Sequence, residues 1–365
     1  MSWLEASLRW YAVSLLLTVG WAPLVRMLCP RLADGGAFVT RPLALLGLVY
    51  PAWLLAALGL LPYATGGLWV TLLIGSVVAW LAAWRRGLVD RRWLGALAAA
   101  EALFLAAFAS YVWLRGFTPE ILNTEKPMDA AFLSSAARTS AIPPPDPWFA
   151  GEPINYYYLG YLLHGALARL SGIVATTAFN LALATTFAMT LTAAAGLGFD
   201  AARPRLSRRR ALTAGGLAAA LLVLVGNLHA AVRLVRAPAE TLAADWWGGI
   251  GWGASRIVCD GPRVADDCPV VDGRIVETIN EFPFFSFLLG DLHPHVMALP
   301  FTLVVLALAL NVALGHRDDS PTAGPAACIA ALVLGAVAGS LYALNSWDMP
   351  TYLPGAAAAT GIGWA

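Results

Sequence analysis

The chain has 365 residues, of which 59% are hydrophobic and only 12% are charged, and its formal net charge is +1. Because a soluble domain carries about 25% charged residues, this composition excludes an ordinary water-soluble globular protein. The sequence also shows no basic, aromatic surface suited to nucleic acid, and its four cysteines are too few for a disulfide scaffold.

Apolar segments recur along the chain at the length of about 20 residues that a membrane-spanning helix needs. Eight complete segments cover residues 8–28, 42–62, 66–84, 93–114, 174–197, 211–228, 296–315 and 323–343. A ninth begins near residue 350 and stops at Ala365 without a polar flank, as in a fragment truncated at its C-terminus. We therefore expect an all-α polytopic membrane protein of about nine spans.

The charge of the connecting loops predicts their sidedness, since cytoplasmic loops carry an excess of Lys and Arg. Arginines dominate residues 26–41, 85–92 and 199–210, which are therefore expected in the cytoplasm. Residues 115–155 then lie outside, and a single span must separate them from residues 199–210. The short apolar segment 156–171 is accordingly predicted to be an interfacial helix that does not cross the membrane.

Three segments on the expected outer face carry residues that hydropathy does not require, and the first is 115–161. Asp129 opens a helical run and Arg138 follows nine residues later, before prolines that end the helix. An acidic residue in this place caps a helix and favours its dipole, or it is a catalytic or metal-binding carboxylate that faces a cavity. Glu125 and Lys126 beside it are solvated loop charges or further members of such a site.

The second segment ends in the run Gly-Asp-Leu-His-Pro-His, in which Asp291, His293 and His295 alternate directly before a span. Imidazole and carboxylate ligands suit Zn or Mn, and carboxylates with water suit Mg, so this run predicts contact with a divalent metal ion or a phosphate. The alternative is a turn at the intervening proline, with the histidines as interfacial hydrogen-bonding groups. Upstream, Cys259 and Cys268 have eight residues between them and are candidates for a disulfide outside the cytoplasm.

The third segment, 345–350, contains Trp347 and Asp348, and an aromatic belt with a polar cap explains both residues. The tyrosine run in the first segment has the same explanation, or it forms a wall on which a sugar or lipid packs. That run consists of Asn155, Tyr156, Tyr157 and Tyr158.

These three motifs together resemble the YYY membrane protein family (DUF2298), over roughly residues 110–365. Members of that family are generally longer, which agrees with a truncated C-terminus. The family is similar in turn to the GT-C glycosyltransferases, which use polyprenyl-phosphate-linked sugars on the outer membrane face. The resemblance implies an N-terminal four-span module, residues 1–114, followed by a GT-C-like catalytic membrane core, residues 115–365.

The resemblance also implies roles for the acidic and basic residues of the first segment. Asp129 would be the general base or a carboxylate next to a metal ion, with Glu125 as a less favoured substitute. Arg138 would contact the lipid phosphate. The GT-C pattern usually has a second acid after the first, and Ala130 stands there instead, which puts metal dependence in doubt.

In the second segment, the resemblance implies that Asp291, His293 and His295 hold a divalent ion (Mg, Mn or Zn) or the lipid phosphate. The remaining polar and aromatic residues would bind substrate. They are Lys126, Asn155, Tyr156, Tyr157, Tyr158, Trp347 and Asp348.

Two classes of function follow from these patterns. One is a membrane glycosyltransferase that moves a lipid-linked sugar to a glycan, lipid or protein acceptor, on the non-cytoplasmic face of a bacterial or archaeal plasma membrane. The other is a transporter or flippase for a lipid-linked substrate. Transport predicts charges deep inside several spans, whereas these spans are nearly free of charge, with Glu101 as the clearest exception. The distribution therefore favours chemistry at the membrane surface.

Overall fold

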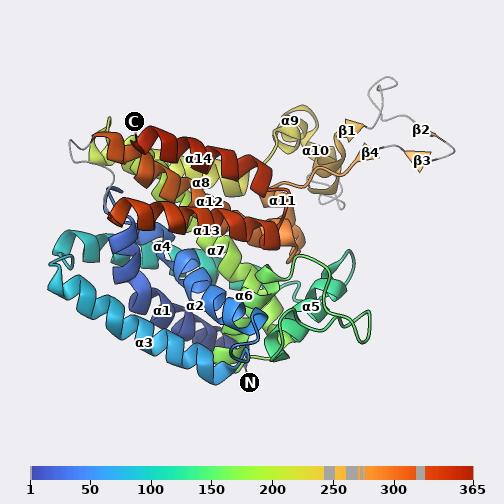
Figure 1. The fold of residues 1–365 in the computed structure, drawn as a ribbon. Coiled ribbons are helices and arrows are strands. Elements are labelled where there is room, and N and C mark those ends of the chain that lie inside the picture. Colours follow the sequence, from blue (N-terminus) through green and yellow to red (C-terminus); the bar gives the residue numbers. More distant parts are fainter. Residues whose placement is uncertain are drawn as a thin grey trace. The chain divides into compact units, whose positions relative to one another are not determined.

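The computed structural model describes residues 2–241, 251–259, 270–271, 274–275, 277–317 and 325–364. The chain divides into two compact units, one of residues Met1–Ala219 and Leu292–Ala365 and one of residues Ala220–Asp291. Helices dominate the first unit (Figure 1). Its helices are α1 (Trp3–Leu28), η1 (Ala37–Val39), α2 (Thr40–Ala57), α3 (Thr65–Arg85), α4 (Arg91–Arg115), α5 (Lys126–Arg138), α6 (Leu159–Ser171), α7 (Ala175–Ala202), nearly all of α8 (Arg208–Ala220), α12 (Pro294–Ala313), η5 (Leu314–Arg317), α13 (Pro325–Leu344) and α14 (Met349–Trp364).

The second unit is built from short elements. They are η2 (Leu221–Val225, a π-helical turn), α9 (His229–Arg236), α10 (Pro238–Thr241), η4 (Gly253–Arg256), β1 (Val258–Cys259), β2 (Val270–Val271), β3 (Arg274–Ile275), β4 (Glu277–Thr278) and α11 (Pro283–Leu289). β1 pairs antiparallel with β4, and β2 pairs antiparallel with β3. These two-residue ladders are a small addition to an otherwise helical chain.

Several helices match the predicted membrane spans. Among the described residues, six are long and apolar enough to cross a bilayer: α1, Ala37–Ala57, α3, α4, α7 and α12. The predicted class, an all-α polytopic membrane protein, is therefore confirmed, while the count of nine spans stays a prediction. The predicted span 211–228 consists of α8 and the π-helical turn η2, and the predicted ninth is α14.

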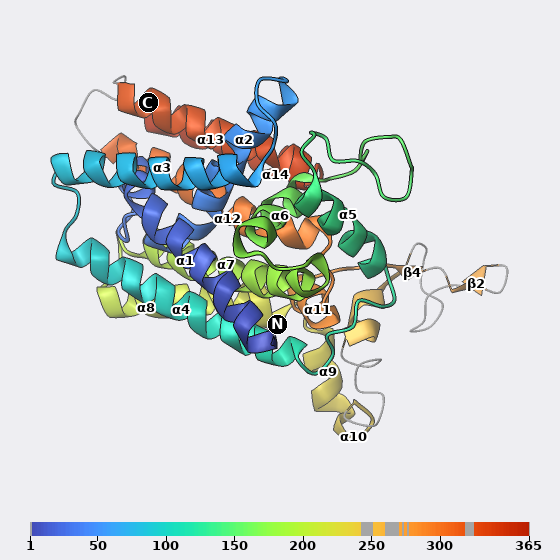
Figure 2. The same cartoon turned by 90° about the horizontal axis from the view of Figure 1, so that it is seen from below.

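The long helices of the first unit pack side by side. α4 lies along α7, α1 contacts α2 and α3, and α12 packs against α7, α13 and α14 (Figure 1 and Figure 2). α1 also contacts α6. Residues 1–114 belong to the same compact unit as residues 115–219. The division into modules expected after residue 114 stays a prediction.

The loops of the first unit gather at two ends of the helices. At one end, here called the tyrosine end (residues 58–64, 116–158, 293–295 and 345–348), the Tyr63 amide donates to Ser140 and the Tyr157 hydroxyl lies 3.0 Å from Ser346 Oγ. At the other, the arginine end (residues 29–38, 84–92 and 199–209), the Asp34 amide donates to Asp200 Oδ1 at 3.0 Å. Each end thus joins loops that are far apart in the sequence.

Glu101 lies between these ends and pairs helices. Its carboxylate accepts from Arg41 of α2 at 2.5 Å and from the Tyr11 hydroxyl of α1 at 2.7 Å. The Arg41 guanidinium also covers the Phe104 ring at 3.4 Å. A charge inside a span needs such a partner because water is absent there.

Helix α6 occupies the predicted non-crossing segment. Its 13 residues reach about 20 Å, less than the hydrocarbon core of about 30 Å. Every residue of α6 except Arg169 is buried, because the helix is apolar on nearly all sides and other helices surround it. Its placement at the membrane interface stays a prediction.

Helix α5 packs closely on α6, through a glycine. A Cβ atom added at Gly165 would lie 3.0 Å from the Ala137 amide nitrogen and 3.1 Å from the Ala136 carbonyl carbon. Gly165 is one turn beyond Tyr161, and Ala136 is two turns beyond Asp129, so these four residues belong to one packed interface. Because residue 165 has no side chain, the backbones of α5 and α6 can approach each other closely at this point.

Candidate functional site

Asp129 is the most buried charged group of the tyrosine end. α5 begins at Lys126 with Glu125 as its N-cap, so Asp129 falls in the first turn and does not cap the helix. Asp129 is 0% exposed. The Tyr161 hydroxyl of α6 donates to Asp129 Oδ1 at 2.5 Å. The carboxylate is therefore held from inside the bundle by a residue 32 positions away.

His293 brings the start of α12 to the same carboxylate. Its Nδ1 lies 3.8 Å from Asp129 Oδ2 and 3.2 Å from Glu125 Oε2. Its Nε2 lies 3.2 Å from the Tyr156 hydroxyl. Asp129 Oδ2 accepts no hydrogen bond from the described residues. Two acids and a histidine from the first and second predicted segments therefore converge around one buried oxygen that accepts no hydrogen bond.

Aromatic rings form one side of this site. Phe132, one turn after Asp129, lies with its ring centroid 5.7 Å from that of Tyr156 and 5.6 Å from that of Tyr161. Tyr156 and Tyr157 pack at 5.0 Å. These rings close the apolar side of the acid cluster, and the half-buried tyrosines border it.

The third predicted segment lies beside the tyrosine run, since Ser346 contacts Tyr157. Within it, the Asn345 side chain donates to Asp348 Oδ2 at 3.0 Å. Burial raises the pKa of Asp348, while this hydrogen bond and the nearby His295 lower it. Trp347 is 81% exposed. The segment therefore offers one partly buried acid and one free aromatic surface.

The chain was compared with protein families, curated proteins and solved structures. The family model described as uncharacterized membrane protein (DUF2298) matches residues 48–363. The chain belongs to this family. The comparisons with curated proteins and with solved structures gave no match. The family match begins at residue 48, so the DUF2298 region leaves out α1 but includes the second half of α2, all of α3 and α4, and the motif-bearing part.

The other predicted substrate residues of this DUF2298 protein differ in their exposure and contacts. Arg138 is exposed at the far end of α5, about 14 Å along the helix from Asp129, and its Nε donates to the Ser134 carbonyl. Asn155 is exposed and Lys126 is buried. The Tyr158 hydroxyl accepts from Trp53 Nε1 at 2.9 Å. The roles predicted for these residues stay predictions.

Two further predicted residues, Asp291 and Cys259, belong to the second unit. Asp291 is its last residue and stands two positions before His293 in the chain. Cys259 is disulfide-bonded, and Cys268, its expected partner, lies outside the described residues. Cys29 and Cys328 are free. The pairing of Cys259 with Cys268 stays a prediction.

Two buried residues of α6 in this DUF2298 protein were not singled out from the sequence. Tyr161 positions Asp129, and His164 contacts the Gly160 carbonyl through Nδ1 at 2.9 Å and Thr186 Oγ1 through Nε2 at 3.1 Å. Burial lowers the pKa of His164 to about 4. A tyrosine and a histidine three residues apart in an apolar helix were the available signal.

Proposed function

We propose that this protein is a GT-C-like glycosyltransferase that transfers a sugar from a polyprenyl-phosphate-linked donor to an acceptor hydroxyl. The acceptor is a glycan, a lipid or a protein on the non-cytoplasmic face of the plasma membrane. The observation that carries the proposal is the buried Asp129 carboxylate, in which Oδ1 accepts a hydrogen bond from Tyr161 and Oδ2 accepts none from the described residues.

Asp129 is suited to act as the general base. Tyr161 fixes Oδ1, so Oδ2 is the oxygen that takes the proton from the acceptor hydroxyl. The acceptor oxygen then forms a bond to the anomeric carbon of the sugar, the bond from that carbon to the phosphate oxygen breaks, and polyprenyl phosphate leaves with the electron pair. The half-buried rings of Tyr156 and Tyr157 border the place where the sugar would lie.

The same residues fit a divalent cation. Two ligands that are each about 2.1 Å from a tetrahedral ion lie about 3.4 Å apart, and His293 Nδ1 is 3.2 Å from Glu125 Oε2 and 3.8 Å from Asp129 Oδ2. Carboxylate and imidazole ligands suit Mn or Zn best. A bound ion would neutralise the leaving phosphate, and Asp129 would then be its ligand.

The distribution of charge supports surface chemistry over transport. Glu101, the clearest charge inside a span, is paired with Arg41 and Tyr11 and holds helices together. Glu125, Asp129 and His293 lie at the tyrosine end. A transport path would instead place polar groups along the depth of several spans.

The decisive experiment measures incorporation of radiolabelled sugar from polyprenyl-phosphate donors by membranes that contain the full-length protein. Asp129→Asn keeps an oxygen for the Tyr161 hydroxyl but removes the base, so we expect incorporation to fall about 100-fold or more. Glu152→Gln, which changes an exposed acid of the same outer segment, is the matched control and should retain activity.

Equal incorporation by Asp129→Asn and the control would overturn the assignment of the base. Movement of the labelled donor across reconstituted vesicles without any transfer would show a flippase instead. Loss of incorporation on chelation, restored by Mn or Zn, would assign Asp129 to the metal, and unchanged incorporation would leave it as the base.

A further inference from the structure

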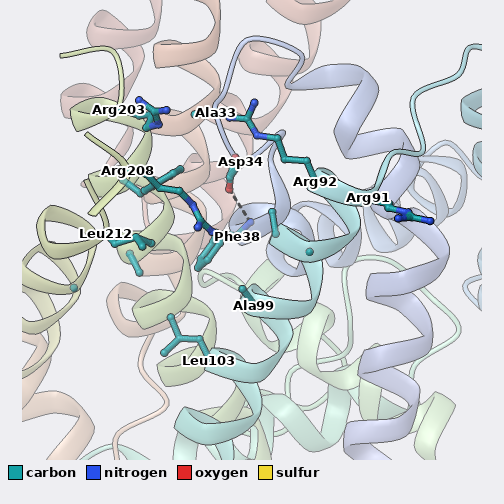
Figure 3. Close-up of a pocket in the computed structure, with 16 residues that line it drawn as sticks. Ala33, Asp34, Phe38, Arg91, Arg92, Ala99, Leu103, Arg203, Arg208 and Leu212 are labelled. Atoms are coloured by element: carbon teal, nitrogen blue, oxygen red, sulfur yellow. Dashed lines mark hydrogen bonds between the residues drawn. The ribbon is translucent and has the colours of Figure 1, made fainter. Parts of the chain in front are cut away.

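A cavity with basic and apolar walls lies at the arginine end of the first unit, away from Asp129. It has a volume of about 770 Å³. Its walls come from the loop at residues 33–38, the first half of α4, the end of α7 and the start of α8 (Figure 3). The proposed transferase chemistry uses none of these residues.

The charged groups of this cavity are nearly all basic. Its lining includes Arg91, Arg92, Arg203 and Arg208 against a single acid, Asp34. Figure 3 shows Arg92, Arg203 and Arg208 around Asp34. Within the described part of the chain no ion pair joins Arg91, Arg92 or Arg208 to an acid. These guanidinium groups are therefore available to an anionic ligand.

The acid in the lining does not cancel this charge. Asp34 is 4% exposed, and its two oxygens accept from the Gly36 amide at 2.6 Å and the Phe38 amide at 3.0 Å. Burial raises the pKa of Asp34. Its carboxyl group is thus turned toward its own loop, and the arginines set the charge of the cavity.

Backbone geometry adds to the attraction for an anion. α4 begins at Arg91 and α8 begins at Arg208, so the positive ends of two helix dipoles accompany the arginines. A guanidinium group bonds phosphate oxygens in a bidentate manner. A phosphate group matches both features.

The deeper part of the cavity is apolar. Leu103 lies twelve residues beyond Arg91, which is about 18 Å along α4. Leu212 lies one turn beyond Arg208 and is 51% exposed. Gly95 and Gly216 leave room in the wall, since a Cβ atom added at either would meet nothing within 4 Å. The cavity thus has a basic mouth and an apolar interior.

We propose that this cavity binds a membrane lipid through an anionic phosphate headgroup. Arg92, Arg203 and Arg208 hold the phosphate, and an acyl or polyprenyl chain lies along the apolar walls of α4 and α8. A soluble phosphate compound would use the basic mouth but not the apolar depth.

Binding of labelled dioleoyl phosphatidic acid to the purified full chain in detergent micelles tests the basic mouth. An arginine near a lipid surface contributes a factor of about five to binding, so Arg92→Gln with Arg208→Gln should weaken binding about 25-fold. The control pair, Arg205→Gln with Arg209→Gln, changes exposed arginines of the same end that do not line the cavity and should leave binding unchanged. Equal weakening by both pairs, or equally tight binding of dioleoyl phosphatidylcholine by the wild type, would overturn the proposal.

The apolar depth is tested by filling it. Gly216→Leu should abolish phosphatidic acid binding, whereas Gly339→Leu, at an exposed glycine of α13 that also has open space around it, should not. Inorganic phosphate should compete poorly with the lipid. If Gly216→Leu binds normally and inorganic phosphate displaces the lipid at equal concentration, the site serves a free phosphate anion and the lipid assignment is wrong.

Discussion

The two ends of the first unit use charge in opposite ways. At the tyrosine end, Asp129 is fully buried and its neighbours are side chains from other helices, Tyr161 and His293. At the arginine end, Arg91, Arg92 and Arg208 are exposed beside a cavity, and the acids Asp34 and Asp200 are the buried groups. The tyrosine end holds a carboxylate in a fixed position, whereas the arginine end presents guanidinium groups to a cavity and to its surroundings.

This difference shows that loop charge alone does not reveal the role of a residue. The arginines that predict sidedness also line a cavity, whereas the buried acids beside them stabilise the fold. Buried charge requires partners and so fixes geometry, while exposed charge remains free to attract ligands. Three changes, from the largest expected effect on stability to the smallest, test this contrast.

Asp34→Ala tests whether the arginine end depends on its buried acid. The change leaves the Gly36 and Phe38 amides without their acceptor, so we expect the free energy of unfolding to fall by about 3 kcal/mol. Chemical denaturation in detergent micelles measures it. Asp90→Ala, at the exposed N-cap of α4 at the same end, should have a clearly smaller effect. Equal losses would mean that burial does not distinguish the two acids.

His164 provides a pH test inside the bundle next to the tyrosine end. Because burial lowers its pKa to about 4, the folded state favours neutral His164. The resulting stability is present above the unfolded pKa of about 6.5 and is lost as the pH falls toward 4. Between pH 7 and pH 5 the free energy of unfolding should fall by about 2 kcal/mol.

His164→Gln should remove this acid-dependent loss, and His295→Gln, at a partly exposed histidine, should retain it. Thermal unfolding at the two pH values compares the three proteins. A wild-type slope that survives in His164→Gln would assign the acid sensitivity to another group.

Trp347→Ala should have the smallest effect on stability, within about 0.5 kcal/mol, because the side chain is 81% exposed. If Trp347 packs on the sugar, the KM for the donor should rise while kcat stays constant. Trp84→Ala, at a 74% exposed tryptophan of the arginine end, is the control and should leave KM unchanged. An identical KM in both variants would remove Trp347 from the substrate site.

The sequence predicted the helical membrane class because an apolar segment of about 20 residues can satisfy its backbone hydrogen bonds inside a bilayer as a helix. The errors lie at helix ends, where local backbone chemistry overrides hydropathy. The predicted span 42–62 ends as a helix at Ala57, since Gly59 adopts a left-handed conformation and Pro62 cannot continue the helix. The predicted span 211–228 changes to a π-helical turn at Leu221 and stops before Gly226.

The candidate site was predictable only in part. Motif content and sidedness placed Asp129 and His293 on one face, and the structure brings them within 3.8 Å. Tyr161 could not be recognised, because pairing across 32 residues depends on how α5 and α6 pack. The cavity at the arginine end was missed for the same reason, since it arises from small residues such as Gly95 and Gly216 on different helices.

Gly165 has a consequence for evolution and engineering of this protein. It bears no chemical group, yet any side chain there would press on the backbone of α5 at Ala136 and Ala137 and separate α5 from α6. The hydrogen bond between Asp129 and Tyr161 spans that same interface. A methyl group at residue 165 would therefore separate Asp129 from Tyr161 and disturb the proposed site without changing any of its own side chains.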